Sequence, residues 1–181
     1  MDEISINTDR LLLRRWKHTD LPPWAALNQD LMVMEFMGRV LSESDSYTFI
    51  KRAERSWDEL GYGPFAVEVA DSHEFIGYIG LAQCNFESHF TPAIEIGWRL
   101  AYKFWNLGYA TEGAAAVMDW AFNTAALDEV VSFTSTLNSR SRRVMEKIGM
   151  ERDAFSDFEH PNVALNSPLR PHLLYRRQRP L

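Results

Sequence analysis

Hydrophobic and polar positions change their spacing at one point in the middle of the chain. Across residues 93–100, apolar side chains occupy every second position, at Ile94, Ile96, Trp98 and Leu100. Alternation with a period of two is typical of a β-strand. From Ala110 onward the apolar residues recur three or four positions apart, at Ala114, Val117, Met118, Ala121 and Phe122, which is helical spacing. Gly108 lies between the two patterns, so the sequence predicts a strand, a tight glycine turn and a helix.

The remaining segments fall into the same two periods. Strands are predicted at residues 8–16, 63–70, 75–84, 129–137, 151–158 and 169–177. Helices are predicted to begin at Asp20, to run from Ser42 to the glycine stop at Gly61, and to cross residues 138–150. The order β α α β β β α β α β β predicts a three-layer α/β (α+β) fold. Its mixed sheet is built mostly of hairpins, with one or two parallel pairings, and is flanked by helices. No repeat or linker interrupts this order, so residues 1–181 are expected to form a single domain.

The amino-acid composition favours a globular protein over a disordered or membrane-spanning one. Hydrophobic residues make up 46% of the 181 positions and aromatic residues 13%, which is typical of a globular core and not of a disordered chain. Cys84 is the single cysteine and cannot form an internal disulfide, which together with the acidic start Met1–Glu3 favours a cytoplasmic protein. No stretch approaches ~18 apolar residues, so no membrane span is expected. The net charge of −6 argues against a broad nucleic-acid surface and is compatible with a cationic substrate.

The glycine turn is a candidate binding site because a helix that begins directly after a strand exposes backbone N–H groups at the positive end of its dipole. Such groups bind phosphate oxygens. Residues 105–112 read W-N-L-G-Y-A-T-E, and this segment resembles the acyl-coenzyme A signature of the Gcn5-related N-acetyltransferases, Q/R-x-x-G-x-G/A. The match is good from Gly108 to Glu112. It departs at Asn106 and Leu107, where glycine and a basic or amide residue are usual. Taken alone, the segment is equally compatible with an ordinary strand–turn–helix connection.

A second segment supports the same resemblance. Residues 138–150 read N-S-R-S-R-R-V-M-E-K-I-G-M, similar to the pattern N-x-x-S-x-R-V-x-E-K-x-G-F/M of the branch that contains the ribosomal-protein N-terminal acetyltransferases. Residues 157–160 and 171–175 are similar to the tail of that branch. The resemblance covers essentially the whole chain. It implies the acyl-CoA N-acyltransferase fold, in which the fourth and fifth strands splay apart to admit acetyl-CoA.

The resemblance also implies which residues bind the coenzyme. They belong to the fourth strand, the glycine turn with the start of its helix, and the start of the second segment at residue 138, namely Trp98, Arg99, Leu100, Asn106, Leu107, Gly108, Tyr109, Ala110, Thr111, Asn138 and Ser141. Acetyl-CoA is expected as the acetyl donor. No metal is expected, because the five histidines show no metal-ligand spacing. His160 and His172 flank a late loop, where they either line the acceptor site or are simply solvated.

Two positions in the second segment have more than one interpretation. Asn138 either caps the helix that follows it or binds the pantetheine arm with its side-chain amide. Ser141 either bonds the backbone or faces the thioester sulfur, where it would be a catalytic residue. Many relatives place a tyrosine four residues further on to protonate the leaving thiolate, but this chain has Met145, which has no proton to donate. Ser141, Tyr175 or water would then have to supply the proton.

Glu95 is the second catalytic candidate. It lies in mid-strand beside Ile94 and Ile96, where a carboxylate is unexpected unless it has a partner. Thirteen residues separate it from Gly108, close to the spacing of the catalytic glutamate in the histone acetyltransferase relatives. A partly apolar cleft would raise its pKa toward neutrality, which suits a general base. The alternative is a structural carboxylate bonded to backbone amides or to an arginine such as Arg99.

These features predict transfer of acetyl from acetyl-CoA to a primary amine by direct attack in a ternary complex. An α-amino group with a pKa near ~8 is roughly 10% neutral at pH 7, whereas a lysine near ~10.4 is about 0.04% neutral. A protein N-terminus is therefore the easier acceptor, and a small-molecule amine is the alternative. No nucleic-acid or membrane partner is expected, and the chain is expected to be a monomer or a homodimer. The competing hypothesis is a non-catalytic acyl-CoA-binding module, which Met145 favours.

Overall fold

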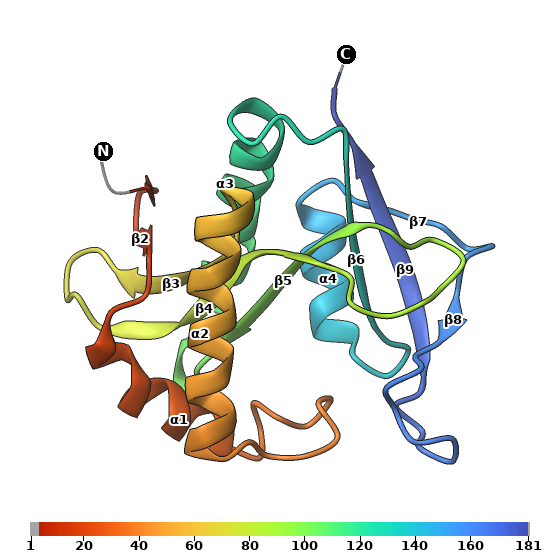
Figure 1. Cartoon of the computed structure of the whole chain (residues 1–181), viewed down its shortest axis with the longest axis horizontal. Coiled ribbons are helices and arrows are strands. Elements are labelled where there is room, and N and C mark those ends of the chain that lie inside the picture. The colour runs from red at the N-terminus through yellow and green to blue at the C-terminus, as the bar shows by residue number, and fades with distance from the viewer. Residues whose placement is uncertain (1–3, 181) are drawn as a thin grey trace.

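A computed structural model describes residues 4–180 and forms a nine-stranded mixed sheet flanked by helices, which confirms the predicted fold (Figure 1). The acidic start Met1–Glu3 lies outside the described residues. Neighbouring strands follow the order β1 (Ser5–Asn7), β2 (Leu11–Arg14), β3 (Pro64–Val69), β4 (Phe75–Gln83), β5 (Ile94–Leu100), β6 (Glu129–Ser135), β9 (Pro171–Gln178) and β7 (Glu151–Arg152). The short strand β8 (Phe158–Glu159) also pairs with β9. Within this sheet β5 and β6 are parallel and the other pairs are antiparallel.

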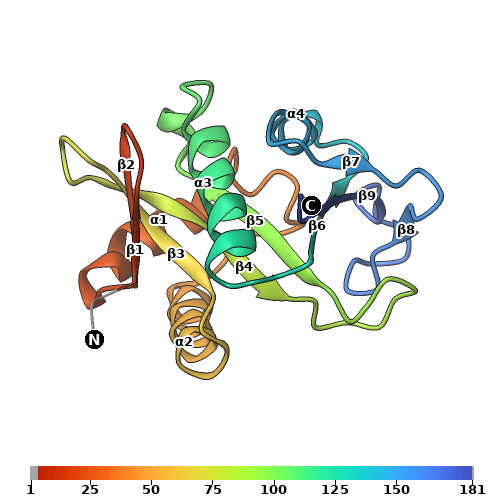
Figure 2. The same cartoon turned by 90° about the horizontal axis from the view of Figure 1, so that it is seen from above.

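The helices cover both faces of the sheet. They are α1 (Leu21–Gln29), α2 (Glu43–Leu60), α3 (Tyr109–Asn123) and α4 (Ser139–Lys147), with short 3-10 turns at His18–Asp20 and Tyr102–Phe104. Figure 2 shows α2 on one side of the strands, and α3 and α4 on the other. Ser42 caps α2 by accepting a hydrogen bond from the Asp45 N–H at 3.0 Å, and Gly61 ends it in the left-handed region at φ 75°.

Two strand predictions differ from the structure. Residues 8–16 form no continuous strand because Thr8 makes a turn: its N–H donates to the Leu11 carbonyl at 2.9 Å, and its hydroxyl oxygen accepts from the Leu11 N–H at 2.9 Å. Residues 151–158 likewise pair only at their ends, as β7 and the start of β8. Between them Asp153 opens a turn whose carbonyl accepts from the Ser156 N–H at 3.0 Å.

Strand β5 separates two packed layers. Ile96 and Leu100 are buried on the face that packs against Val117 and Met118 of α3. Trp24 of α1 is fully buried on the opposite face, in a cluster of aromatic rings that includes Phe49 and Tyr78. The alternation of β5 therefore sends Ile96, Trp98 and Leu100 toward α3, and Glu95, Gly97 and Arg99 toward α1.

A buried ion network ties the edge of the sheet to the entry of α1. The guanidinium of Arg14 donates to both carboxylate oxygens of Asp20, at 2.7 and 2.8 Å, and its Nε donates to Glu68 at 2.8 Å. All three side chains are buried, with Arg14 4% exposed and Asp20 2% exposed. Hydrogen bonds and charge attraction from both carboxylates hold the pKa of Arg14 above its ordinary value, although burial opposes them. The Arg14 guanidinium therefore stays charged although it is buried.

Replacing Arg14 should reduce the stability of the protein far more than replacing a surface arginine. Arg14→Met leaves two buried carboxylates without a cation, which is expected to cost about 3–5 kcal/mol of unfolding free energy. The matched control is Arg55→Met, because Arg55 makes only an exposed ion pair with Glu59. Urea unfolding of both variants measures the difference, and equal midpoints would show that the network does not hold this edge together.

Candidate active site

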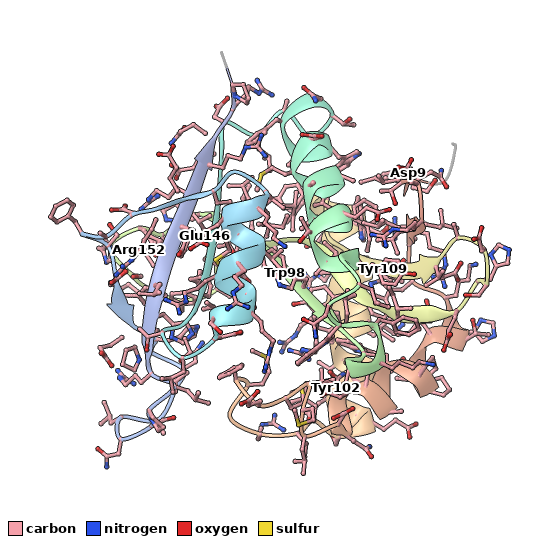
Figure 3. The ribbon with its side chains drawn as sticks, turned by 180° about the vertical axis from the view of Figure 1, so that it is seen from behind. Asp9, Trp98, Tyr102, Tyr109, Glu146 and Arg152 are labelled. Carbon is pink, nitrogen blue, oxygen red and sulfur yellow. The ribbon has the colours of Figure 1, made fainter. Side chains whose placement is uncertain are left out.

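A single cavity of about 1090 Å³ brings together all the site residues that the sequence predicts. Its wall is formed by β5, by the turn and first residues of α3, by the end of β6 with the start of α4, and by the segments before α2 and β9. The predicted residues on it are Glu95, Trp98, Arg99, Leu100, Asn106, Leu107, Gly108, Tyr109, Ala110, Thr111, Asn138 and Ser141. Residues that lie far apart along the chain therefore share one space, and Trp98 lies between α3 and α4 (Figure 3).

The cavity exists because β5 and β6 pair only briefly. In the described residues their parallel register holds at one position, Glu95 opposite Val131. One residue further along each strand, the Ser132 hydroxyl donates to the Ile96 carbonyl at 2.9 Å and takes the place of a strand–strand bond. Since alternate residues of a strand direct their backbone groups to the same edge, the Trp98 N–H also faces this side. Beyond Ile96 the strands part, and the Trp98 N–H faces the gap.

The start of α3 forms the second element of the site. Gly108 is its N-cap residue at φ 86°, a left-handed conformation that glycine adopts without strain. No acceptor within residues 4–180 meets the backbone N–H groups of residues 108–111. Asn106 also has a positive φ, 62°, which explains why glycine is usual at this position and why asparagine is tolerated. The turn thus presents a row of free N–H donors to the cavity.

Hydrogen bonds around Glu112 hold the glycine turn in place, and the sequence analysis did not predict them. Glu112 accepts hydrogen bonds from the Thr8 hydroxyl at 2.6 Å, from the Arg10 N–H at 2.9 Å and from Arg10 Nε at 2.6 Å. Arg10 in turn donates to the Leu107 carbonyl at 2.9 Å and lies over the Tyr109 ring. Arg10 therefore supports the turn through the Leu107 carbonyl, while its own charge is paired with Glu112. No local pattern could reveal this contact, because almost a hundred residues separate the two positions.

The start of α4 orients the Ser141 hydroxyl. Asn138 caps the helix by accepting from the Ser141 N–H at 3.1 Å, and its amide donates to Ser141 Oγ at 3.0 Å and to Thr134 Oγ1 at 3.1 Å. Both amide hydrogens of Asn138 are thus bonded within the protein, which supports the interpretation that Asn138 caps the helix. Because Ser141 Oγ accepts the amide, its own proton is available to a group in the cavity.

Two ionisable side chains of β5 face the cavity without a countercharge. Glu95 is mostly buried, and within residues 4–180 it has neither a hydrogen-bond donor nor an ion-pair partner. Burial alone raises its pKa from 4.5 to about 7. Arg99 does not pair with it: the guanidinium donates to Asn28 Oδ1 at 2.6 Å and to the Met37 sulfur at 2.9 Å. The structural alternative for Glu95, a carboxylate bonded to amides or to Arg99, is therefore absent.

Of the remaining candidate residues, some line the cavity and one lies in the core. His160 and His172 both line the cavity with ring centroids 4.8 Å apart, and burial lowers the pKa of both, that of His160 to about 4. Met145 lines the cavity as well and is 1% exposed. Tyr175 lies elsewhere, because its hydroxyl donates to Glu146 Oε1 at 3.1 Å in the layer behind α4. Tyr175 is therefore not placed to protonate a thiolate in this cavity.

Neither a metal site nor a membrane helix is found in the described chain. Across residues 4–180, no three His, Cys, Asp or Glu side chains are grouped so that they could hold a metal ion. The helices in the same range are all too short or too polar to cross a bilayer.

A mixed sheet that opens between two parallel strands, beside an uncapped helix start, defines an acyl-CoA N-acyltransferase fold. The model of the acetyltransferase (GNAT) domain matches residues 10–151. YnaD, an uncharacterised N-acetyltransferase of Bacillus subtilis, is 31% identical over 151 residues, which are 83% of this chain and 84% of YnaD. The chain belongs to the GNAT acetyltransferase family, and it is an acetyl-CoA-dependent N-acetyltransferase.

Solved structures agree with the family. A GNAT-family acetyltransferase from Bacillus anthracis superposes with a TM-score of 0.80 at 26% identity, covering 97% of this chain and 99% of the other. RimL, a ribosomal L7/L12 alpha-N-protein acetyltransferase in complex with coenzyme A, superposes with a TM-score of 0.76 at 16% identity, over 97% of this chain and 98% of RimL. The second likeness shows that the fold is shared with a protein that binds coenzyme A.

The burial of Glu95 should make stability depend on pH. Between pH 4.5 and 7 the folded carboxyl keeps a proton that the unfolded chain has lost, so stability falls as pH rises through this window. Glu95→Gln removes that penalty. The variant should unfold like the parent near pH 4 and be more stable at pH 8, by up to about 3 kcal/mol. Thermal unfolding across this range measures it, and a difference independent of pH would contradict the raised pKa.

Proposed function

We propose that the chain transfers acetyl from acetyl-CoA to a primary amine, by direct attack of the amine on the thioester in a ternary complex. One observation supports this most strongly. A gap between two parallel strands and a row of free N–H groups at a helix start open into the same cavity. The first suits an extended arm that bonds to a strand edge, and the second suits a pyrophosphate.

The free backbone N–H groups indicate where acetyl-CoA binds. The N–H groups of residues 108–111 bind the pyrophosphate oxygens, and the left-handed Gly108 lets the backbone approach them closely. The pantetheine arm lies in the gap beside Trp98 and Leu100, close to the edge of β5. Asn138 supports this side of the gap as the cap of α4. Arg10 and Glu112 keep the turn in place from outside the cavity.

The transfer needs an oxyanion donor, a base and a proton for the thiolate. The Trp98 N–H faces the gap and polarises the thioester carbonyl. The amine nitrogen attacks the carbonyl carbon, and its proton passes through water to the Glu95 carboxylate, whose pKa of about 7 suits a base at neutral pH. The carbon–sulfur bond then breaks, and the Ser141 hydroxyl, oriented by Asn138, passes its proton to the sulfur. Ser141 takes a proton in return through water from the protonated Glu95, so that both side chains regain their starting states. The products are the amide and free coenzyme A.

An α-amine is the preferred acceptor, and a small-molecule amine is the alternative. An α-amine presents several hundred times more of its neutral form at pH 7 than a lysine does, a difference on the order of 3 kcal/mol. RimL, which shares the fold, is an alpha-N-protein acetyltransferase by name. Neither argument depends on the identity of the residues that follow the amine in the acceptor.

Gly108→Val should abolish coenzyme binding while the protein stays folded. A side chain at this φ of 86° is strained, and its Cβ would lie 3.2 Å from Arg10 Nη2, so the row of N–H groups is lost. Losing two charge-assisted bonds costs roughly 10²-fold or more in affinity. The matched control is Asn106→Gly, which removes the strain at φ 62° and should bind at least as well as the parent. Calorimetric titration with coenzyme A, beside circular dichroism, decides it. Parent-like binding by folded Gly108→Val would refute this binding site.

Release of free thiol from acetyl-CoA tests the reaction itself. The parent is expected to acetylate a short peptide with a free α-amine faster than the same peptide blocked at its α-amine and carrying one lysine. Glu95→Gln should lower kcat by roughly 10²–10⁴-fold with the affinity for acetyl-CoA unchanged. Turnover that is unaffected by this substitution would remove Glu95 from the mechanism, and a parent that releases no thiol with any amine would refute the proposed function.

A further inference from the structure

The half of the cavity that faces α1 contains an arginine that no carboxylate neutralises. Arg99 is mostly buried, and the described residues supply it with only two hydrogen-bond acceptors, Asn28 Oδ1 and the Met37 sulfur. Its guanidinium lies 5.3 Å from the ring centroid of Trp24 and 6.0 Å from that of Tyr78. A guanidinium has five N–H donors, so most of the donors of Arg99 remain available on the cavity side.

The other arginines of the same wall differ. Arg39 pairs with Asp45 at 3.0 Å, and Arg140 pairs with Glu35. Arg143 is exposed to water on α4. Arg99 is the mostly buried arginine of this wall without a carboxylate in the described chain, and burial lowers its pKa. A buried cation is costly unless it is paired, so an anion that enters the cavity would be bound strongly.

The structure holds this guanidinium in place before any ligand arrives. Asn28 is fully buried, and its amide nitrogen donates to Ser46 Oγ at 3.0 Å, which directs the amide oxygen toward Arg99. The aromatic rings restrict the guanidinium from the sides. A cation that is already oriented loses little entropy on binding, which is the geometry of a binding site and not of a flexible surface arginine.

Arg99 shares its face of β5 with the proposed base. Glu95 lies four residues earlier on the same face, roughly 13 Å away between Cα atoms, and Gly97 between them carries no side chain of its own. The Tyr78 hydroxyl lies 3.3 Å from the position that a Cβ on Gly97 would occupy. This face of β5 therefore offers a base at one end and a fixed cation at the other, with the Tyr78 hydroxyl between them.

We propose that the acceptor carries, several bonds away from its amine, an anionic carboxylate or phosphate that Arg99 binds. This inference rests on the proposed function, since it places the acceptor amine beside Glu95. An acceptor of this class is an extended amino acid or amino phosphate, with its charges at opposite ends, and it belongs to the small-molecule amines that the proposed function gives as the alternative to a protein N-terminus. Arg99, which the sequence analysis assigned to the coenzyme, thereby becomes the residue that selects the acceptor.

Binding, and not turnover, tests the site. The protein is saturated with coenzyme A, which gives a complex that cannot react, and is titrated calorimetrically with ω-amino acids of increasing chain length from β-alanine upward. The matching ω-amino carboxamides and ω-aminoalkyl phosphates form the second and third series. At the best chain length, the acid or the phosphate should bind roughly 10- to 100-fold more tightly than the amide. Comparison of these two series shows which anion is preferred.

The variants separate Arg99 from general charge effects. Arg99→Met keeps the length of the side chain without its charge and should reduce the ratio of acid to amide affinity to about one. Arg99→Lys should keep part of the ratio, and Arg143→Met, which removes an exposed arginine of the same wall, should leave it unchanged. If acid and amide bind the parent equally, or if the preference survives in Arg99→Met, the inference is wrong. If the preference is found and yet no amine releases thiol from acetyl-CoA, the anion site stands and the proposed transfer reaction is wrong.

Discussion

The parting of β5 from β6 is the constraint on which the rest of the molecule depends. Two parallel strands in the middle of a sheet normally bond along their whole length, because unpaired backbone groups in a protein interior are costly. Here the pairing is limited to Glu95 and Val131, with the Ser132 hydroxyl satisfying the next carbonyl. Everything that the cavity offers, from the Trp98 N–H to the free start of α3, is exposed because the strands separate at this point. The long antiparallel pairings on either side, β4 with β5 and β6 with β9, keep each half of the sheet intact beside the opening.

Strand β5 also carries two ionisable side chains that lack a countercharge in the described residues. Glu95 and Arg99 are both mostly buried, both face the cavity, and neither pairs with the other or with an opposite charge in the described residues. Arg14 differs from them, because it is almost fully buried and has the carboxylates of Asp20 and Glu68 around it. The network around Arg14 stabilises the fold, whereas the unpaired Glu95 and Arg99 of β5 can form pairs with a bound ligand.

The sequence predicts the parts of the site that depend on neighbours along the chain. The change from strand to helix period around Gly108 locates the turn, and the position of Glu95 in mid-strand marks it as exceptional. Contacts between distant segments escape this reasoning. Arg10 donates to the Leu107 carbonyl from near the start of the chain, and the pairing of Arg99 with Asn28 depends on which face of β5 packs against α1. The predicted strand at residues 151–158 is wrong for a related reason. Its apolar and polar pattern is compatible with pairing, but Asp153 makes a turn instead.

In the proposed binding mode, the donor substrate in the opening of the sheet is also a structural component. A molecule that occupies the gap supplies hydrogen bonds that the chain does not make for itself, so it binds the folded protein and not the unfolded one. At a concentration 100 times the dissociation constant, such a ligand adds about 2.7 kcal/mol to folding stability. Marginally stable proteins change several-fold in abundance over energies of this size. The cellular lifetime of this enzyme should therefore follow the supply of acetyl-CoA, so that the amount of catalyst falls when its acetyl donor is scarce.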